Sequence, residues 1–151
     1  ACKEEIYDAI IDNAPKGTIE LFHGYTYSGI PVSVAAALAV QEIFEKEDIF
    51  NRSKEMAPYF QEAIFSLKDI DVVENIRGYG MMAGIDMKMD KKPGVAGFTC
   101  FKHCYDAGVN FKATGDCLII APMFISEKKH IDEIIEKLRT GINNYAKSKK
   151  N

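Results

Sequence analysis

The residues best suited to chemistry lie in the loop 23–31, whose sequence is His-Gly-Tyr-Thr-Tyr-Ser-Gly-Ile-Pro. Thr26 offers a hydroxyl group and a backbone N–H shortly before a predicted helix. A helix N-terminus adds oriented N–H donors and partial positive charge, so a phosphate group would be favourably placed there. The pattern therefore predicts an anion site at Tyr25 and Thr26, with a purely structural loop as the alternative.

Lys112 is a second candidate for an anion contact. It lies in a predicted strand next to the turn 113–116, whose sequence is Ala-Thr-Gly-Asp. Its ammonium group carries the charge that a carboxylate or a phosphate needs, but a solvated surface lysine has the same local sequence. Both interpretations stay open on the residue pattern alone.

A group of cysteine and histidine side chains could bind a metal. In a helix, Cys100, His103 and Cys104 would lie on adjacent turns. A structural zinc needs a fourth ligand and usually draws on two separated pairs. Only Cys117 or His130 could supply that ligand, and nothing in their spacing demands it. Because free cysteines are commonly buried as small hydrophobic residues, packed cysteines are the favoured interpretation.

Two other patterns resemble catalytic motifs without matching them. The glycines at 78, 80 and 84 suggest a phosphate loop, but the dinucleotide-binding fingerprint lies between a strand and a helix. Here the third glycine comes one residue late and a strand follows, so a turn is predicted, with Arg77 in a surface ion pair. Ser28 lacks the first glycine of the G-x-S-x-G elbow, so a hydrolase is not supported.

Hydrophobic spacing predicts three helices in the first part of the chain. They cover residues 3–13, 32–46 and 48–67, and a short extended segment over 18–22 leads into the loop. Pro31 takes a first-turn position in which proline is tolerated, and alanines follow it. The helix it begins is small and apolar all round in its first half, which predicts burial. Pro58 predicts a kink or a restart in the third helix.

Strand and helix patterns alternate after residue 70. The predicted strands are 72–77 and 81–88, joined by the turn 78–80, and 109–112 and 117–120, joined by the turn 113–116. The predicted helices are 95–106, with Phe98, Phe101, Cys104 and Tyr105 buried, and 127–146, capped by Ser126 and with an apolar stripe from Ile131 to Tyr145. This order predicts an α+β fold with an antiparallel-rich sheet and helices on one face.

Composition excludes several classes of protein. At 151 residues with 47% apolar and 27% charged residues, the chain can bury a core without disulfides. A net charge of −3 does not provide the basic face that nucleic acids require. No apolar run approaches the roughly 18 residues that span a bilayer.

The four cysteines form no disulfide-scaffold pattern, which favours an intracellular, cytoplasmic protein. The chain does not begin with methionine, which is compatible with a piece of something longer.

The sequence resembles the class III pyridoxal-phosphate-dependent aminotransferases, especially the omega-amino acid:pyruvate (β-alanine:pyruvate) transaminases. The segment 23–29, His-Gly-Tyr-Thr-Tyr-Ser-Gly, is the most specific match, and the alanine-rich helix follows it as in the family. Supporting matches are Glu5-Ile6-Tyr7-Asp8, Ile76-Arg77-Gly78-Tyr79-Gly80-Met81, Gly108, Lys112, Gly115-Asp116-Cys117-Leu118 and Ala121-Pro122. The resemblance covers nearly the whole chain.

The resemblance implies the C-terminal part of a fold-type I homodimer. Residues 1–29 would end the large cofactor-binding domain and carry the phosphate-contact loop, residues 30–49 would form the connecting helix, and residues 50–151 would form the small domain. The lysine that holds pyridoxal phosphate lies upstream of this segment in the family, so no lysine here takes that role. The whole enzyme would move an amino group from an omega-amino acid or amine to pyruvate or another keto acid, and this chain alone would be inactive.

The resemblance also implies roles for individual residues. Thr26 matches a threonine that hydrogen-bonds the cofactor phosphate of the other subunit, and Tyr25 lies beside it. Lys112 stands where omega-transaminases have an arginine that binds the substrate carboxylate. Lysine keeps the charge but loses the bidentate geometry of a guanidinium group.

A second hypothesis belongs to a different class of protein. The chain could be a stand-alone α+β small-molecule-binding or regulatory module that dimerises through the apolar helix 32–46. An open reading frame that extends upstream, with a lysine shortly before Ala1, supports the enzyme. A start codon just before Ala1 favours the module.

Overall fold

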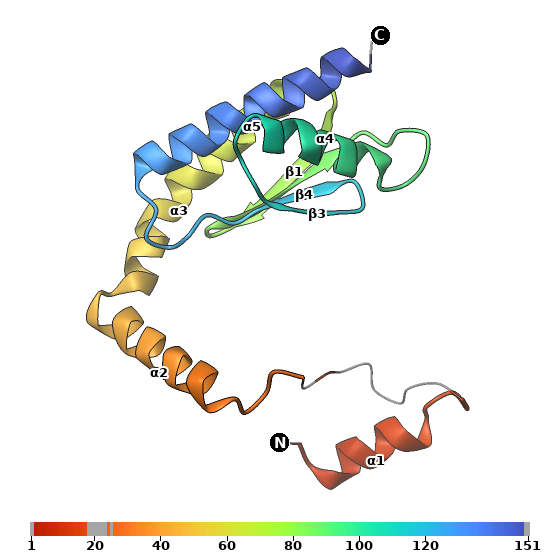
Figure 1. Ribbon diagram of the computed structural model, residues 1–151, viewed down its shortest axis with the longest axis vertical. Helices are drawn as coiled ribbons and strands as arrows, with labels where there is room; N and C mark the ends of the chain where they lie inside the picture. Colours follow the sequence, from red (N-terminus) through yellow and green to blue (C-terminus); the bar gives the residue numbers. More distant parts are fainter. Residues whose placement is uncertain (1, 18–23, 25, 150–151) are drawn as a thin grey trace. The chain divides into compact units, whose positions relative to one another are not determined.

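The computed structural model describes residues 2–17, 24 and 26–149. By internal contacts the chain divides into two units, Ala1–Val40 and Gln41–Asn151. Each unit is described by itself (Figure 1). Of the predicted elements, the extended segment at 18–22 lies outside the described residues.

The first unit contains helix α1 (Glu4–Asp12) and most of helix α2 (Pro31–Lys46), which continues into the second unit. Both helices were predicted from the sequence and both are confirmed. Pro31 is the first residue of α2, where its missing N–H costs no helical hydrogen bond. Neither helix has a buried residue. The predicted burial of the first half of α2 is therefore not seen within this chain.

Helix α3 (Ile49–Phe65) opens the main part of the second unit and continues as a 3-10 turn, η1 (Ser66–Asp69). The helix runs through Pro58 without interruption, so the predicted restart is wrong. Asp48 precedes α3 in the left-handed conformation, with φ of 49°. Its carboxylate accepts two hydrogen bonds from the Asn51 side-chain amide, at 2.8 and 3.0 Å, in the first turn of α3.

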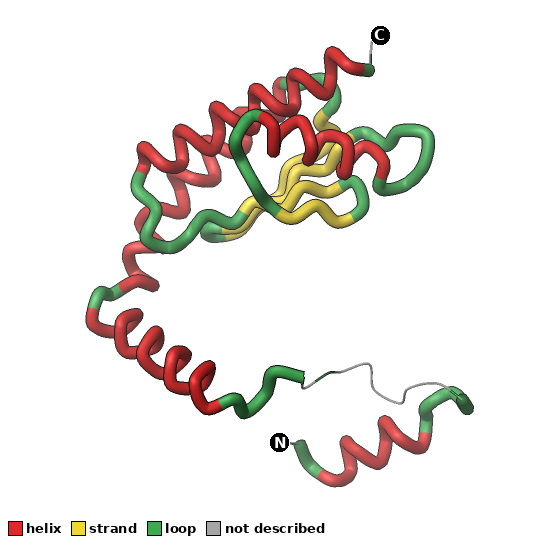
Figure 2. Tube along the Cα trace, in the orientation of Figure 1, coloured by secondary structure: helices red, strands yellow, loops and turns green. Residues whose placement is uncertain are grey.

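Four antiparallel strands form one sheet in the order β1-β2-β4-β3. They are β1 (Val73–Tyr79), β2 (Met82–Met87), β3 (Lys112–Thr114) and β4 (Cys117–Ile120). Helices α3, α4 (Val95–Asp106) and α5 (Lys128–Ser148) cover one face of this sheet (Figures 1 and 2). The predicted α+β fold, with an antiparallel sheet and helices on one face, is confirmed.

Both hairpin turns are tighter than predicted. Gly78 and Tyr79 pair with Ala83 and Met82 and so belong to β1, which leaves only Gly80 and Met81 in the turn. The second hairpin likewise turns at residues 115–116, and residues 109–111 are not in a strand. In each turn a glycine with φ of 58° supplies the left-handed conformation that a two-residue hairpin needs.

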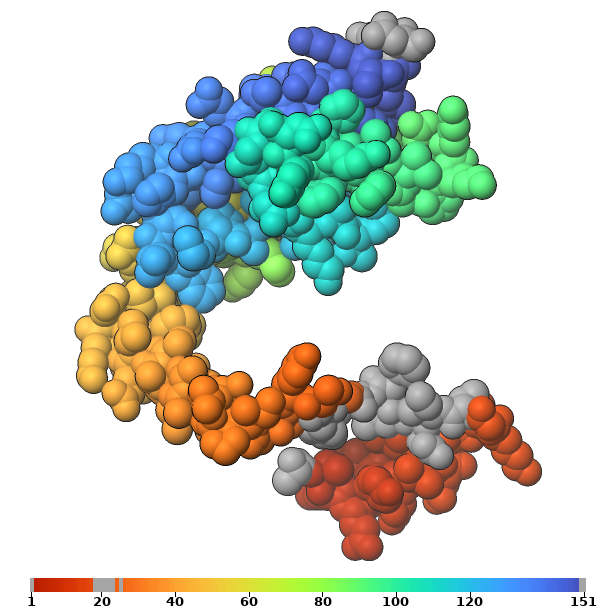
Figure 3. Space-filling view, viewed as in Figure 1, coloured from red at the N-terminus to blue at the C-terminus, as the bar shows by residue number. Residues whose placement is uncertain are grey.

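Helix α4 buries its small residues and exposes most of its aromatic ones. The buried residues are Ala96, Gly97, Cys100 and Cys104, whereas Phe98 and Tyr105 are 59% and 61% exposed. The predicted buried face is therefore confirmed at Cys104, wrong at Phe98 and Tyr105, and half-buried at Phe101. The reason is the close approach of α5, because a Cβ on Gly141 would lie 2.5 Å from the Cys104 Cα. Figure 3 shows α4 and α5 side by side on the surface of the second unit.

Helix α5 begins after Glu127, whose backbone N–H donates to His130 Nδ1 at 3.0 Å. The predicted cap, Ser126, is instead buried one residue earlier. The predicted apolar stripe is confirmed, since Ile131, Leu138 and Tyr145 are among the buried residues of α5. None of the helices within the described ranges is long and apolar enough to cross a membrane.

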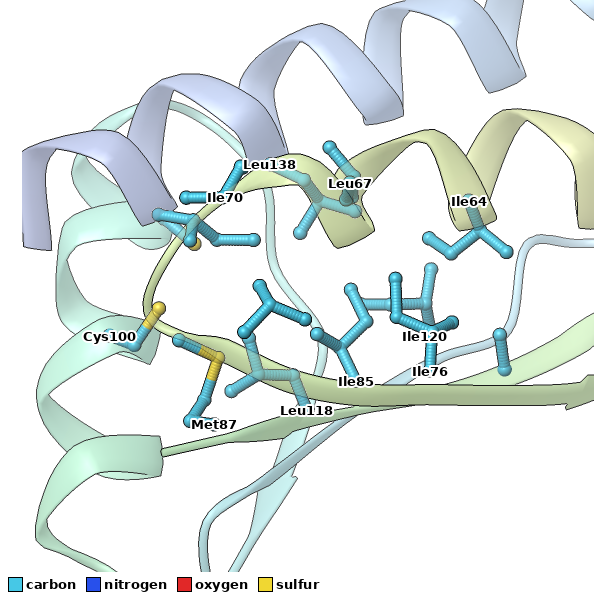
Figure 4. Packing of buried hydrophobic residues seen from close by; sticks show 14 of the residues in the cluster. Ile64, Leu67, Ile70, Ile76, Ile85, Met87, Cys100, Leu118, Ile120 and Leu138 are labelled. Carbon is cyan, nitrogen blue, oxygen red and sulfur yellow. The ribbon is translucent and has the colours of Figure 1, made fainter. Parts of the chain in front are cut away.

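The core lies between the covered face of the sheet and helices α3 and α5 (Figure 4). Side chains from α3, η1 and α5 meet alternate residues of β1, β2 and β4, among them Ile64, Leu67, Ile76, Ile85, Leu118, Ile120 and Leu138. Successive residues of a strand point to opposite faces of the sheet. The residues between the buried ones therefore lie on the opposite face, which no described helix of this unit covers.

Candidate functional site

The helix-free face of the sheet carries a row of four residues, one from each strand. Arg77 pairs with Gly84, Gly84 with Ile119, and Ile119 with Lys112. Directly paired residues of an antiparallel sheet project from the same face. The row therefore places a cationic residue on each edge strand, with a glycine and an isoleucine between them.

Lys112 is the first residue of β3, and its side chain is exposed. A groove of about 610 Å³ lies beside it, with Phe111, Ile119 and Pro122 among its apolar walls. The groove also includes Lys137, whose Nζ donates to Glu133 Oε1 at 2.5 Å. This hydrogen bond lowers the pKa of Glu133 and offsets the charge of Lys137. Within the described ranges, no acidic partner is seen for Lys112.

Arg77 differs from Lys112 because its charge is offset. Its guanidinium group forms an ion pair with Asp86 and donates to the Cys117 thiol at 3.5 Å. Gly84 leaves room for this arrangement, since an added Cβ would lie 3.1 Å from the Cys117 Sγ. The predicted surface ion pair is confirmed, and Lys112 is the cation of the row that is available to an external anion.

Thr26 belongs to the first unit, in the turn 26–29 that leads into α2. The residue is exposed, and Gly29 in the same turn has φ of 73°. The first helical hydrogen bond runs from the Val34 N–H to the Ile30 carbonyl at 3.0 Å. Thr26 thus precedes a helix in sequence, as predicted, and that helix begins at Pro31. Tyr25 lies outside the described residues.

A family model for class-III aminotransferases matches residues 1–142. The chain belongs to this family. It is 39% identical over 142 residues to an omega-aminotransferase of Caulobacter vibrioides, covering 92% of the chain and 32% of that relative. It is 37% identical to a putrescine–pyruvate aminotransferase and 31% identical to a beta-alanine–pyruvate aminotransferase, both of Pseudomonas aeruginosa. These matches cover 89% and 94% of the chain but 31% and 32% of the relatives.

Solved structures agree with the family assignment. A transaminase with L-alanine superposes with a TM-score of 0.75 at 26% identity, covering 80% of this chain and 30% of that one. A thermostable omega transaminase mutant from Pseudomonas jessenii gives a TM-score of 0.73 at 25% identity, covering 83% and 29%. The class-III aminotransferase chain thus has the α+β fold that the resemblance implied. It spans about a third of the length of the curated relatives it matches.

Two of the four cysteines of this class-III aminotransferase chain are core residues. Cys100 and Cys104 are fully buried in the core, as the packed-cysteine interpretation predicted. A hydrogen bond with Cys104, together with burial, raises the pKa of the Cys100 thiol. No group of three or more metal-ligating side chains occurs in the part of the chain that the structure describes.

The residue pattern indicates Thr26 and Lys112 but not the row in which Lys112 lies. Apolar residues alternate along 83–87 and 117–120. Once these strands are paired, that alternation places Gly84 and Ile119 on the same face of the sheet. Which strands pair depends on their order in the sheet, and that order could not be inferred from the sequence.

Proposed function

We propose that this chain is the C-terminal portion of a pyridoxal-phosphate-dependent transaminase. The whole enzyme moves an amino group from an omega-amino acid or amine to pyruvate or another keto acid. The observation that carries this proposal is the class-III family match over residues 1–142, together with relatives named for amino transfer to pyruvate. Because the chain spans about a third of those relatives, the activity belongs to a longer protein and the chain alone is inactive.

The same proposal assigns each segment of the chain to a part of the whole enzyme. Residues 1–29 end the large domain and carry the phosphate-contact loop, residues 30–49 form the connecting helix, and residues 50–151 form the small domain. Cysteine usage favours a cytoplasmic enzyme.

The turn before α2 fits one end of the cofactor, its phosphate group. The exposed Thr26 hydroxyl can donate to a phosphate oxygen, and the N-terminus of the 16-residue helix α2, which begins at Pro31, contributes partial positive charge. Tyr25 is the neighbouring contact. When bound, the cofactor supplies an electron sink for amino transfer, and its Schiff-base lysine comes from outside this chain.

Lys112 binds the substrate carboxylate in this proposal. Its ammonium group stands beside an apolar groove, so an aliphatic chain can lie on Phe111 and Ile119 while the carboxylate pairs with the lysine. A lysine attracts a carboxylate as a point charge and does not impose the bidentate geometry of arginine. The site therefore suits an omega-amino acid, whose carboxylate lies at one end of an aliphatic chain.

The partner is a second copy of the same enzyme, and α2 supports this assembly. The helix has no buried residue, and Val32, Val34 and Leu38 are exposed by 80%, 47% and 62%. An apolar helix of this kind is typical of a surface that another domain or subunit covers. In a homodimer, Thr26 would contact the cofactor phosphate of the partner subunit.

The test is to express the whole open reading frame that contains this chain. We expect it to extend upstream of Ala1 and the purified protein to form alanine from β-alanine and pyruvate. Borohydride reduction should then trap pyridoxal phosphate on a lysine upstream of Ala1. The same reduction on the 151-residue chain alone should trap no stoichiometric adduct on any one lysine. A start codon just before Ala1, or such an adduct within this chain, would refute the proposal.

A further inference from the structure

Strand β3, which begins with Lys112, is weakly held by the sheet itself. It has three residues and lies at the edge, so among the described residues β4 is its only strand partner. A short edge strand leaves half of its backbone groups without a neighbouring strand. The direction in which Lys112 projects must therefore depend on contacts outside the sheet.

Asp116, in the turn between β3 and β4, provides the first of these contacts. Its carboxylate accepts hydrogen bonds from the backbone N–H groups of Gly94 at 2.9 Å and Gly97 at 3.0 Å. Gly94 is the N-cap residue of α4 and has no side chain with which to cap the helix. A carboxylate at a helix N-terminus is stabilised by the unsatisfied N–H groups and by the helix dipole. Asp116 thus caps a helix that begins about twenty residues earlier in the chain.

The backbone around Asp116 confirms that this contact is close. An added Cβ on Gly97 would lie 2.2 Å from the Gly115 carbonyl oxygen, so only glycine permits the approach. The Asp116 carbonyl in turn accepts a hydrogen bond from the Met87 N–H at 2.8 Å, at the end of β2. One residue therefore joins the hairpin that contains β3 to α4 and to the central part of the sheet.

The other end of β3 contacts the same helix. The Phe111 ring, just before Lys112, packs edge-to-face on the Phe101 ring of α4, with centroids 5.4 Å apart. Helix α4 is itself set against α5 by the close contact between Cys104 and Gly141. Lys112 thus lies between two points at which α4 holds the chain.

We propose that Asp116 is a positioning residue for Lys112. By capping α4, its carboxylate fixes the β3–β4 hairpin so that the Lys112 ammonium group is presented to the substrate carboxylate. The inference rests on the proposed function, because it takes Lys112 as the carboxylate contact. Asp116 touches neither substrate nor cofactor in this scheme.

The test uses the full-length protein with two donors, β-alanine and propylamine, which differ by the carboxylate. Lys112→Ala should raise the KM for β-alanine by about 10- to 100-fold, because one charge-assisted contact is lost, and leave propylamine unchanged. Asp116→Ala should raise the same KM by roughly 3- to 10-fold, again without effect on propylamine. Inhibition by propionate, which has a carboxylate and no amino group, should weaken in parallel. Asp106→Asn, an exposed carboxylate at the far end of α4, is the control and should change neither donor.

The double variant separates positioning from a general structural effect. If Asp116 acts through Lys112, Lys112→Ala/Asp116→Ala should match Lys112→Ala alone. Additive losses, or equal losses for both donors, would overturn the inference. If the alanine variant does not fold, Asp116→Asn, which keeps one acceptor oxygen, takes its place in the same comparison of KM values for the two donors. An unchanged KM in Lys112→Ala would instead refute the carboxylate role, and with it the proposed function of that site.

Discussion

Gly97→Ala is the sharpest test of the contact between α4 and the β3–β4 turn. The new Cβ would lie 2.2 Å from the Gly115 carbonyl oxygen and 2.9 Å from the Asp116 Cα. Both are backbone atoms, so no change of side-chain rotamer relieves the overlap. The turn must move by roughly 1 Å to restore ordinary packing, and that movement stretches the 3.0 Å hydrogen bond from the Gly97 N–H to Asp116.

Three effects set the magnitude. Overpacking at a close contact costs about 1–3 kcal/mol. Loss of the Asp116 cap costs about 0.5–2 kcal/mol. Replacing glycine by alanine within a helix raises the free energy of unfolding by up to about 1 kcal/mol. The free energy of unfolding should therefore fall by about 2 kcal/mol, and the extremes of these ranges still leave a net loss.

The assay is urea unfolding of the chain, followed by far-ultraviolet circular dichroism. With a slope of about 2 kcal/mol per molar urea, the midpoint should fall by about 1 M. Asn144→Ala, an exposed substitution in α5, is the control and should shift stability by at most about 0.5 kcal/mol. A Gly97→Ala variant as stable as the wild type, at an unchanged slope, would show that the turn is not in close contact with α4.

Four further predictions concern the core and the site. Leu138→Ala should reduce the unfolding free energy by about 2–5 kcal/mol in the same urea assay, because Leu138 is fully buried between α5 and the sheet. The Cys104 hydrogen bond and burial raise the pKa of Cys100, so the folded state keeps the thiol protonated after the unfolded chain ionises. The unfolding free energy should therefore fall as pH rises above about 8.5, by up to about 1.4 kcal/mol per pH unit. The Cys100→Ala variant should lack this fall when its unfolding is measured at pH 8 and pH 10 under reducing conditions. In the full-length protein, Thr26→Val should weaken pyridoxal phosphate binding by about 10-fold or more while Thr26→Ser should not, as measured by equilibrium dialysis; equal affinities would refute the phosphate contact. Lys112→Arg should lower the KM for β-alanine by about 5-fold and leave that for propylamine unchanged, since guanidinium offers a second hydrogen bond; a shift for both donors would contradict the assigned role.

Local sequence was sufficient for most of the helices. The stripe that includes Ile131, Leu138 and Tyr145 predicted the buried face of α5, because residues at helical spacing share one face whatever they contact. Pro31 and the alanines after it predicted α2 for an equally local reason. These features depend on neighbours within two turns of helix, so the sequence contains all that is needed to infer them.

The error in the buried face of α4 arose because a distant segment decides which residues are buried. Aromatic residues favoured Phe98 and Tyr105 as the buried face of α4, yet the close approach of Gly141 admits only small residues there. The strand ends were misplaced for a different, local reason. A glycine with positive φ can complete a turn in two residues, so the flanking residues pair as part of the strands.

For the candidate site, residue types and the family resemblance by themselves selected Tyr25, Thr26 and Lys112. Only the tertiary structure showed that Lys112 shares a face with Arg77, that Arg77 is already paired with Asp86, and that Asp116 holds the hairpin against α4. The physical reason is that charge and hydrogen-bonding capacity belong to each residue in isolation. Their availability depends on strand register and on contacts between residues far apart in the chain, which no local pattern encodes.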